Sequence, residues 1–256
     1  MPRWRPVTQV IQDAGNLQLT IIVMAKQAIV GQVKTRLIGA LTPINAALLH
    51  LAMLDCVLCL AQQYVVDQRI RSLLLAVARD SEGQAGKKLG PITPGPAWSL
   101  LDQVGSDLGQ RMANAWRFAG GGPVVFLGGD TPDLPGWLLA KILPALDVAD
   151  VAIGSTGDGG YWTLGANQFQ PELFCGIDWG TDRVYQQTCE AVHGAGVNLV
   201  ELPGWHDVDV PMDVVALQKR MRANDWAVEH ENNDTICEVY LRLTDHLELV
   251  CGDLES

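Results

Sequence analysis

Positive charge is scarce in this sequence. Only 18% of its 256 residues are charged, and 18 Lys and Arg against 29 Asp and Glu leave a formal net charge of −11 at pH 7. A nucleic-acid surface needs a broad basic stripe, and an anionic membrane attracts cationic surfaces. The composition therefore argues against nucleic acid and membrane as partners, and a local cluster of Lys and Arg stands out.

Long hydrophobic runs are also absent. The longest near-apolar stretch, AALLHLAMLDCVLCLA (46–61), has 16 residues and contains His50 and Asp55, whereas a membrane-spanning helix needs about 20 apolar residues. We therefore expect a buried helix here. The opening residues MPRWRPVTQVIQDAGN lack the apolar segment of a secretory signal, so we expect a cytoplasmic protein.

The six cysteines offer little paired chemistry. They are scattered through apolar surroundings, as reduced core cysteines are, and a cytoplasmic protein is not expected to form disulfides. Cys56 and Cys59 form a C-x-x-C pair, but they lie within the predicted helix and have no second pair nearby. We interpret them as core residues rather than a zinc or redox site.

Apolar runs alternate with helical patterns along the chain. Thr42 followed by Pro43 begins one helix, and Asp107 with Gln110 forms a capping pair for another. Such alternation predicts an α/β fold, a mainly parallel twisted sheet of Rossmann-like type flanked by helices. Strands are predicted at 17–25, 70–78, 98–103, 123–128, 150–155, 161–166 and 197–202, and helices at 42–64, from 107, 137–146 and 181–196.

We divide the chain into an N-terminal extension (1–16), one domain (17–224) and an acidic C-terminal extension (225–256). The last segment holds nine Asp or Glu and one basic residue, Arg242, so a disordered tail is one interpretation. Thr235 and Glu238 nevertheless form a capping box, and apolar residues recur at helical spacing: Ile236, Val239, Tyr240, Leu243, Leu247 and Val250. We favour a packed helix, structural in role or part of a homo-oligomer contact.

The basic residues gather in one segment, AKQAIVGQVKTRL (25–37), where Lys26, Lys34 and Arg36 surround Gly31 directly after the first predicted strand. Ligands of parallel sheets bind beyond the carboxyl ends of the strands. Ammonium and guanidinium groups donate to phosphate oxygens, and Gly31 permits close backbone approach. We interpret the segment as a phosphate-binding loop, although it lacks the Walker pattern G-x-x-x-x-G-K-[ST].

A carboxylate follows the predicted central strand in GGDTPDLP (128–135). Asp130 stands at the strand end, where Gly128 and Gly129 leave room for a ligand, and Asp133 could cap the next helix. Two phosphates held together need a divalent cation, and Mg²⁺ or Mn²⁺ takes carboxylate oxygens. Asp130 is therefore the first predicted metal ligand.

The second carboxylate loop, HDVDVPMD (206–213), follows the last predicted strand. Asp213 belongs to the helix start after Pro211, whereas Asp207 or Asp209 is the second metal ligand, and the sequence does not rank the two. His206 is more simply explained as a loop residue than as a ligand. A metal between the two loops would join segments far apart in the sequence.

GDGGYW (157–162) forms a sharp turn that presents Asp158. The carboxylate could bind sugar or acceptor hydroxyls and take a proton, or it could be an ordinary turn aspartate. Spacing alone does not separate the two.

Together these segments resemble a family of bacterial nucleotide-diphospho-sugar transferase-like proteins of the GT-A superfamily, described as arsenosugar-biosynthesis-type glycosyltransferases and formerly as a family of uncharacterised function. Six blocks in family order carry the resemblance, from about residue 19 to 217: AKQAIVGQVKTRL, QVGSDLGQRM, GGDTPDLP, GDGGYWTLG, LFCGIDWGTDRV and DVDVPMDV. Two positions depart from the family pattern, which has proline near Ala28 and arginine at Gln32.

The resemblance implies a GT-A fold that uses Mg²⁺ or Mn²⁺ and a nucleotide-sugar donor. Asp130 and Asp209 would hold the metal, and Asp158 and Tyr161 would face the sugar or acceptor. Lys34 and Asp158 are the expected catalytic residues. The expected nucleotide-binding residues are Lys26, Gly31, Lys34, Arg36, Arg111, Gly129 and Tyr161.

Three functions fit these expectations. In glycosyl transfer, a small-molecule acceptor hydroxyl attacks the anomeric carbon while metal and basic loop stabilise the leaving nucleoside diphosphate. In nucleotidyl transfer, a phosphorylated substrate attacks a nucleoside triphosphate and pyrophosphate leaves, as in the similar phospholactate guanylyltransferases. The third is a non-catalytic nucleotide-binding module, against which the two carboxylate loops argue. We favour glycosyl transfer.

Overall fold

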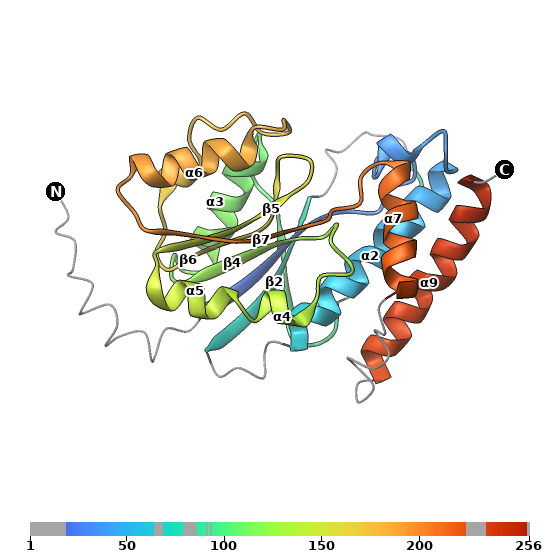
Figure 1. The fold of residues 1–256 in the computed structure, drawn as a ribbon, viewed down its shortest axis with the longest axis horizontal. Helices are drawn as coiled ribbons and strands as arrows, with labels where there is room; N and C mark the ends of the chain where they lie inside the picture. Colours follow the sequence, from blue (N-terminus) through green and yellow to red (C-terminus); the bar gives the residue numbers. More distant parts are fainter. Residues whose placement is uncertain are drawn as a thin grey trace.

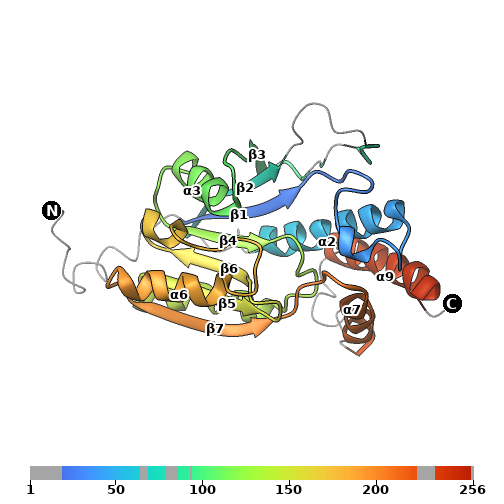
Figure 2. The same ribbon diagram turned by 90° about the horizontal axis from the view of Figure 1, so that it is seen from above.

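The computed structural model describes residues 19–63, 69–78, 86–90, 92, 94–223 and 234–254. The predicted extension 1–16 lies outside the described residues. Within them the strands form one sheet of order β3-β2-β1-β4-β6-β5-β7 (Figure 2). The strands are β1 (Leu19–Lys26), β2 (Ile70–Ala78), β3 (Trp98–Asp102), β4 (Val124–Gly128), β5 (Val151–Thr156), β6 (Tyr161–Ala166) and β7 (Leu199–Trp205).

The sheet is mainly parallel, as predicted. β1 pairs in parallel with β2 and β4, β2 with β3, and β5 with β7, whereas β6 runs antiparallel to β4 and β5. The short turn between β5 and β6 requires that antiparallel pairing. β7 extends beyond the predicted 197–202, through Pro203 and Gly204, because an edge strand tolerates a proline without an amide donor.

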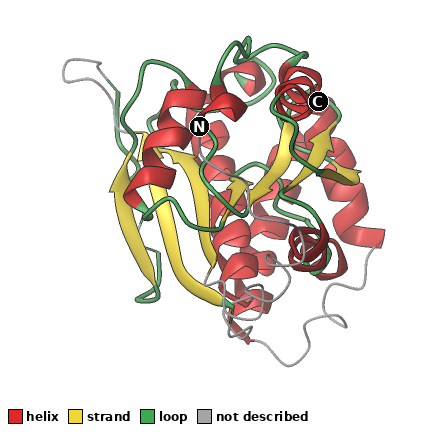
Figure 3. Cartoon of the chain, turned by 90° about the vertical axis from the view of Figure 1, so that its left-hand side faces the viewer, coloured by secondary structure: helices red, strands yellow, loops and turns green. Residues whose placement is uncertain are grey.

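Helices cover both faces of the twisted sheet (Figure 3). In the view of Figure 1, α3 and α6 lie above the sheet and α2, α4 and α5 below it. Two short 3₁₀ turns, η2 (Thr35–Leu37) and η4 (Pro171–Phe174), complete the described elements. The helices are α2 (Pro43–Gln63), α3 (Leu108–Phe118), α4 (Gly136–Leu139), α5 (Ile142–Val148), α6 (Val184–Gly194), α7 (Pro211–Ala223) and α9 (Asp234–Leu254).

The predicted helix caps are present. The Thr42 hydroxyl accepts a hydrogen bond from the Asn45 amide (3.2 Å), and Asp107 accepts one from the Gln110 amide (2.8 Å). The single helix predicted at 137–146 is wrong, because the segment forms α4 and α5 in succession. Pro144 lies in the first turn of α5, where no amide donor is needed, whereas a continuous helix would have required one there.

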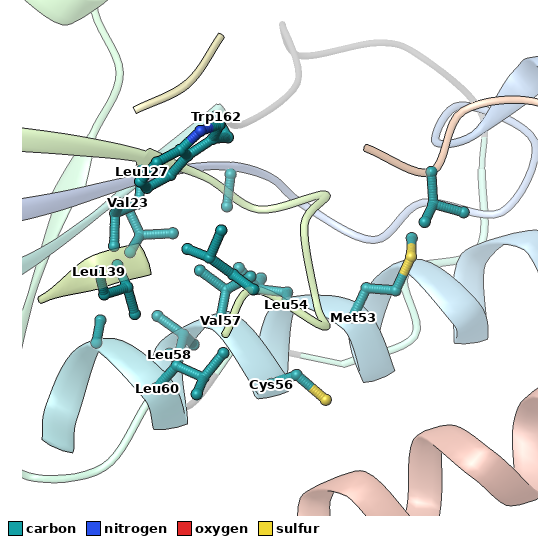
Figure 4. Packing of buried hydrophobic residues seen from close by; sticks show 14 of the residues in the cluster. Val23, Met53, Leu54, Cys56, Val57, Leu58, Leu60, Leu127, Leu139 and Trp162 are labelled. Carbon is teal, nitrogen blue, oxygen red and sulfur yellow. The ribbon is translucent and has the colours of Figure 1, made fainter. Parts of the chain in front are cut away.

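Helix α2 is the core helix beneath the sheet. Its Leu54 and Val57 lie toward Val23 and Leu127 of the sheet, whereas Cys56 points toward α9 (Figure 4). Among the described residues α2 is long and apolar enough to span a membrane, but 61% of its most apolar stretch is buried inside the protein. That burial is typical of the core helix of a folded domain.

Helix α9 packs along α2 and α7 rather than forming a tail (Figure 1). Its buried side chains belong to the same hydrophobic core as α2, and the Tyr240 hydroxyl donates to the carbonyl of Pro132 (2.9 Å). The buried side chains of α9 are Val239, Tyr240, Leu243, Leu247 and Val250. The terminal helix therefore supports the loop that follows β4.

Asp133 in that loop does not cap the next helix, contrary to the sequence-based alternative. Its side chain is fully buried and accepts hydrogen bonds from Arg220 Nε of α7 (2.5 Å) and from Trp205 Nε1 (3.3 Å). The N-cap position of α4 is Pro135, which makes no side-chain cap. Asp133 therefore joins the loop after β4 to α7.

Arg220→Met should destabilise the fold by about 3–5 kcal/mol, because it leaves the buried Asp133 carboxylate uncompensated. Urea unfolding at neutral pH measures this loss. The matched control is Arg222→Met, because Arg222 is exposed on the same helix and its loss should cost less than about 0.5 kcal/mol. Equal stability of the two variants would contradict a structural role for this ion pair.

Candidate functional site

Three loops meet at the carboxyl edge of the sheet. β1 and β4 are parallel neighbours, so the loops that follow them begin side by side. The loop after β7 returns from the sheet edge to join them, since the Val208 amide donates to the Asp130 carbonyl (3.1 Å). The fold thus brings the basic segment and both carboxylate loops together.

Lys34 links all three loops. Its ammonium donates to the Val208 carbonyl (2.7 Å) and lies 2.9 Å from Asp130 Oδ1 and 3.7 Å from Asp209 Oδ1. Only 4% of the Lys34 side chain is exposed. Its backbone is left-handed (φ 47°), a conformation that costs a non-glycine residue about 1–2 kcal/mol. The surrounding contacts must offset this strain.

Asp209 is held by two cations. Its second carboxylate oxygen lies 2.6 Å from the Arg36 guanidinium, which is mostly exposed. The Asp213 carboxylate accepts the amides of Asp209 (2.9 Å) and Val210 (2.8 Å) at the start of α7. Asp213 therefore belongs to the helix start, as predicted, and it fixes the loop that presents Asp209.

Asp130 has one protected and one open side. Although 46% of its side chain is exposed, the surrounding loops withdraw the carboxylate from bulk water, which works against ionisation. The neighbouring basic groups, Lys34 foremost, together outweigh this effect and hold the pKa of Asp130 below its ordinary value. Asp130 is therefore ionised and accessible from solvent at neutral pH.

His50 of α2 reaches the same place. One ring nitrogen, Nε2, donates to the Lys26 carbonyl at the end of β1 (2.9 Å), and Nδ1 lies 4.0 Å from Asp130 Oδ1. Nδ1 is buried and has no hydrogen-bond partner. Burial lowers the pKa of His50 despite the opposing effect of Asp130, so the neutral ring is favoured.

Asp207 faces a different neighbour from Asp209. Burial, and then repulsion by Asp158, raises the pKa of the Asp207 carboxyl to about 6. Asp158 itself accepts hydrogen bonds from the Thr156 hydroxyl (2.6 Å) and the Gly160 amide (2.9 Å) within its own turn. The ordinary turn role of Asp158 is thus satisfied, while its position beside Asp207 keeps it close to the third loop.

Tyr161 lies at the start of β6 and is turned toward α3. Its hydroxyl donates to Met112 Sδ (3.5 Å), and burial raises its pKa well above the ordinary value. Arg111 of α3 donates from Nε to the Gly105 carbonyl (3.1 Å). The structure therefore places Tyr161 and Arg111 beside α3, and neither is among the contacts of Lys34.

The remaining predicted residues differ in their surroundings. Lys26 is exposed at the end of β1, and Gly31 has a positive φ of 84° in an open part of the loop. Gly129 is buried, and a Cβ atom there would lie 3.3 Å from Leu54 Cδ1 and 3.4 Å from the Met24 carbonyl. The prediction that Gly129 leaves room for a ligand is wrong, because this glycine allows α2 to pack against the strand ends.

Sequence reasoning missed a second basic segment. Residues 86–90 run beside the loop after β1, since the Val30 amide donates to the Lys87 carbonyl and the Leu89 amide to the Ala28 carbonyl, both at 3.1 Å. This pairing places the exposed Lys87 and Lys88 next to the predicted phosphate loop. The signal was present as two adjacent lysines in a glycine-rich stretch.

Sequence reasoning also missed two residues that hold the strand ends together. Gln103 Nε2 donates to the carbonyls of Ala25 (3.0 Å) and Ala76 (2.8 Å) and so ties β1 to β2. His50 stood out in the sequence only as a polar residue within an apolar helix. The sequence does not indicate that Gln103 or His50 joins the strand ends, because their partners are backbone atoms from distant segments.

The residues present fit a divalent cation held partly by substrate. Among the described residues, no group of three or more His, Cys, Asp and Glu side chains could hold a metal alone, so Asp130, Asp207 and Asp209 do not form a three-carboxylate cage. Mg²⁺ and Mn²⁺ sites in nucleotide enzymes commonly use one or two carboxylates with phosphates and water. The ionised, half-exposed Asp130 suits that arrangement.

Comparison with known proteins identifies the family of this chain. Residues 60–181 match the family described as "Uncharacterized protein conserved in bacteria (DUF2064)". A crystal structure from Desulfovibrio desulfuricans G20, provisionally named a nucleotide-diphospho-sugar transferase, is 30% identical over 92% of this chain and 97% of that one, with a TM-score of 0.70. The chain belongs to this nucleotide-diphospho-sugar transferase-like family. The resemblance noted in the sequence is thereby confirmed.

More distant structures share only the fold with this chain. 4-diphosphocytidyl-2C-methyl-D-erythritol synthase from Anaerococcus prevotii DSM 20548 is 11% identical over 84% of this chain and 99% of that one, with a TM-score of 0.51. No curated protein matches the chain.

Lys34→Met should destabilise the protein by about 1–3 kcal/mol, because two partly exposed carboxylates lose their shared cation. The pKa of Asp130 is depressed in the folded protein, so the stabilising effect is complete above the ordinary carboxyl pKa and is lost as pH falls through the folded value. The stability gap between wild type and variant should therefore be widest at neutral pH and narrow on acidification.

Urea titrations at several pH values measure this gap. Lys219→Met is the matched control, because Lys219 is exposed on α7, and it should leave stability nearly unchanged at every pH. A gap that is independent of pH would contradict the proposed pairing of Lys34 with Asp130.

Proposed function

We propose that this protein is a metal-dependent glycosyltransferase that takes a nucleotide-diphospho-sugar donor and transfers the sugar to a small-molecule acceptor. The supporting observation is that Lys34 Nζ lies within 4 Å of both Asp130 and Asp209 at the carboxyl edge of the sheet, where ligands of such sheets bind. Family membership supports the nucleotide-sugar donor. Mg²⁺ or Mn²⁺ is the proposed cofactor.

The chain's own residues have distinct roles in this proposal. Lys34 neutralises charge that develops on the leaving diphosphate, because a preorganised ammonium requires little reorganisation during the reaction. Arg36 and Lys26, which are exposed beside it, hold the outer phosphate oxygens. Asp130 would hold the cation, which supplies further charge stabilisation to the diphosphate when bound.

The acceptor side is assigned to the β5–β6 turn. Asp158 is exposed there and Asp207 lies close enough to feel its charge. Asp207 is the carboxyl of this pair whose pKa is raised, to about 6, so it is suited to exchange a proton beside an attacking hydroxyl. Asp158 remains the proposed catalytic carboxylate, with Asp207 as its neighbour.

Nucleotidyl transfer is the second candidate, and one observation favours it. Lys87 and Lys88 add two cations beside the loop that already carries Lys26, Lys34 and Arg36. A nucleoside triphosphate carries more negative charge than a nucleotide sugar, so a longer basic flank suits it. In this reaction a phosphorylated acceptor attacks the α-phosphate and pyrophosphate leaves.

The leaving group decides between the two reactions. The protein is incubated with Mn²⁺ and a panel of nucleotide sugars, and separately with nucleoside triphosphates and sugar phosphates. Release of nucleoside diphosphate in the first set, dependent on acceptor and metal, is the expected result. Pyrophosphate released only in the second set would replace glycosyl transfer by nucleotidyl transfer, and saturable binding without turnover would indicate a binding protein.

Asp130→Ala should abolish metal-dependent donor binding while the fold persists, because it removes the accessible carboxylate of the site. Calorimetric titration with a nucleotide sugar, with and without Mn²⁺, measures the change. Asp147→Ala is the matched control, since Asp147 pairs with Arg69 outside the site. Unchanged metal dependence in the Asp130 variant would remove this residue from the metal site.

A further inference from the structure

The His50 side chain is the unusual feature of the site. It comes from the core helix α2, is buried, and is fixed by its Nε2 donor to the Lys26 carbonyl at 2.9 Å. A carbonyl oxygen can only accept, so Nε2 carries the hydrogen and Nδ1 of the neutral ring presents a lone pair. A carboxylate oxygen, Asp130 Oδ1, lies 4.0 Å from Nδ1.

Two acceptors this close together, one of them buried, are unfavourable unless positive charge lies between them. Lys34 meets Asp130 Oδ1 at 2.9 Å, but His50 Nδ1 has no hydrogen-bond partner. A carboxylate oxygen has two lone-pair positions, so Asp130 Oδ1 can serve Lys34 and a second cation together. A metal ion with bonds of about 2.1 Å holds neighbouring ligand atoms about 3.0–3.4 Å apart, so Nδ1 and Oδ1 need to approach by less than about 1 Å to share one ion.

Asp209 is less available than His50 as the second ligand of this metal ion. Its carboxylate oxygens already face Lys34 and Arg36, at 3.7 and 2.6 Å. A histidine that binds a metal usually donates its other ring N–H to a carbonyl or carboxylate, which fixes the tautomer. The hydrogen bond from His50 to the Lys26 carbonyl is a contact of this kind.

We propose that His50 Nδ1 and Asp130 Oδ1 are the protein ligands of the divalent cation, with phosphate and water completing the coordination. Asp209 then orients Lys34 and Arg36 instead of binding the metal. Imidazole nitrogen favours transition metals over Mg²⁺, which prefers oxygen ligands, and this preference is weakest for Mn²⁺ and stronger for Co²⁺ and Zn²⁺. The centre therefore selects a transition metal. This inference rests on the metal dependence of the proposed function but not on which group is transferred.

Pulsed electron paramagnetic resonance of bound Mn²⁺ tests the proposal through ¹⁴N coupling. The full chain is loaded with Mn²⁺ alone and with Mn²⁺ plus UDP or GDP. The wild type should show one coupled imidazole nitrogen in at least the nucleotide sample. Because this measurement needs no variant, a wild type that binds Mn²⁺ without nitrogen coupling, or binds none in either sample, overturns the proposal.

Variants then assign the nitrogen. His50→Gln should remove the coupling and weaken Mn²⁺ binding by more than about tenfold, the loss typical even of an outer-shell partner, with a much smaller effect on Mg²⁺. His206→Gln and His193→Gln are matched controls and should retain the coupling. Coupling that survives His50→Gln in a variant of native thermal stability, or disappears in His206→Gln, contradicts the assignment. Neither outcome bears on the leaving group, so failure here is separable from failure of glycosyl transfer.

Discussion

One buried ammonium organises this edge of the molecule. Lys34 Nζ contacts Asp130, the Val208 carbonyl and Asp209, and so it joins the loops after β1, β4 and β7. A nearly fully buried cation is tolerable only when oxygen atoms surround it. The loops must therefore converge for Lys34 to be buried, and the convergence in turn places the exposed cations beside an ionised Asp130.

The rest of the fold supports this junction from behind. Gly129 lets Leu54 of α2 approach the strand ends, Asp133 ties the loop after β4 to Arg220 of α7, and α9 covers the opposite side of α2. Each contact lies outside the ligand site, yet each limits where Asp130 can stand. The proposed catalytic arrangement depends on these supporting residues, because they fix the loops that carry it.

The sequence predicts the sheet and the meeting of the loops for a simple physical reason. Buried parallel strands are uniformly apolar, and the charged residues that follow them gather at one edge. This rule placed Lys34, Asp130 and Asp209 together. The rule does not predict the roles of residues whose partners come from distant elements. Asp133 resembles a helix cap in the sequence, but in the structure it pairs with Arg220. Gly129 suggests space for a ligand, but in the structure Leu54 packs against it. The role of His50 could not be predicted either, because its hydrogen-bond partner is a backbone carbonyl.

The central claim is that the three loops cage a metal-bridged diphosphate. A crystal of the protein with Mn²⁺ and a nucleoside diphosphate, measured for anomalous scattering, tests it most directly. The account predicts a manganese peak at Asp130 with the diphosphate lying against Lys34 and Arg36. A metal and diphosphate found together at another part of the surface, with Lys34 still enclosed by carboxylates alone, would contradict it.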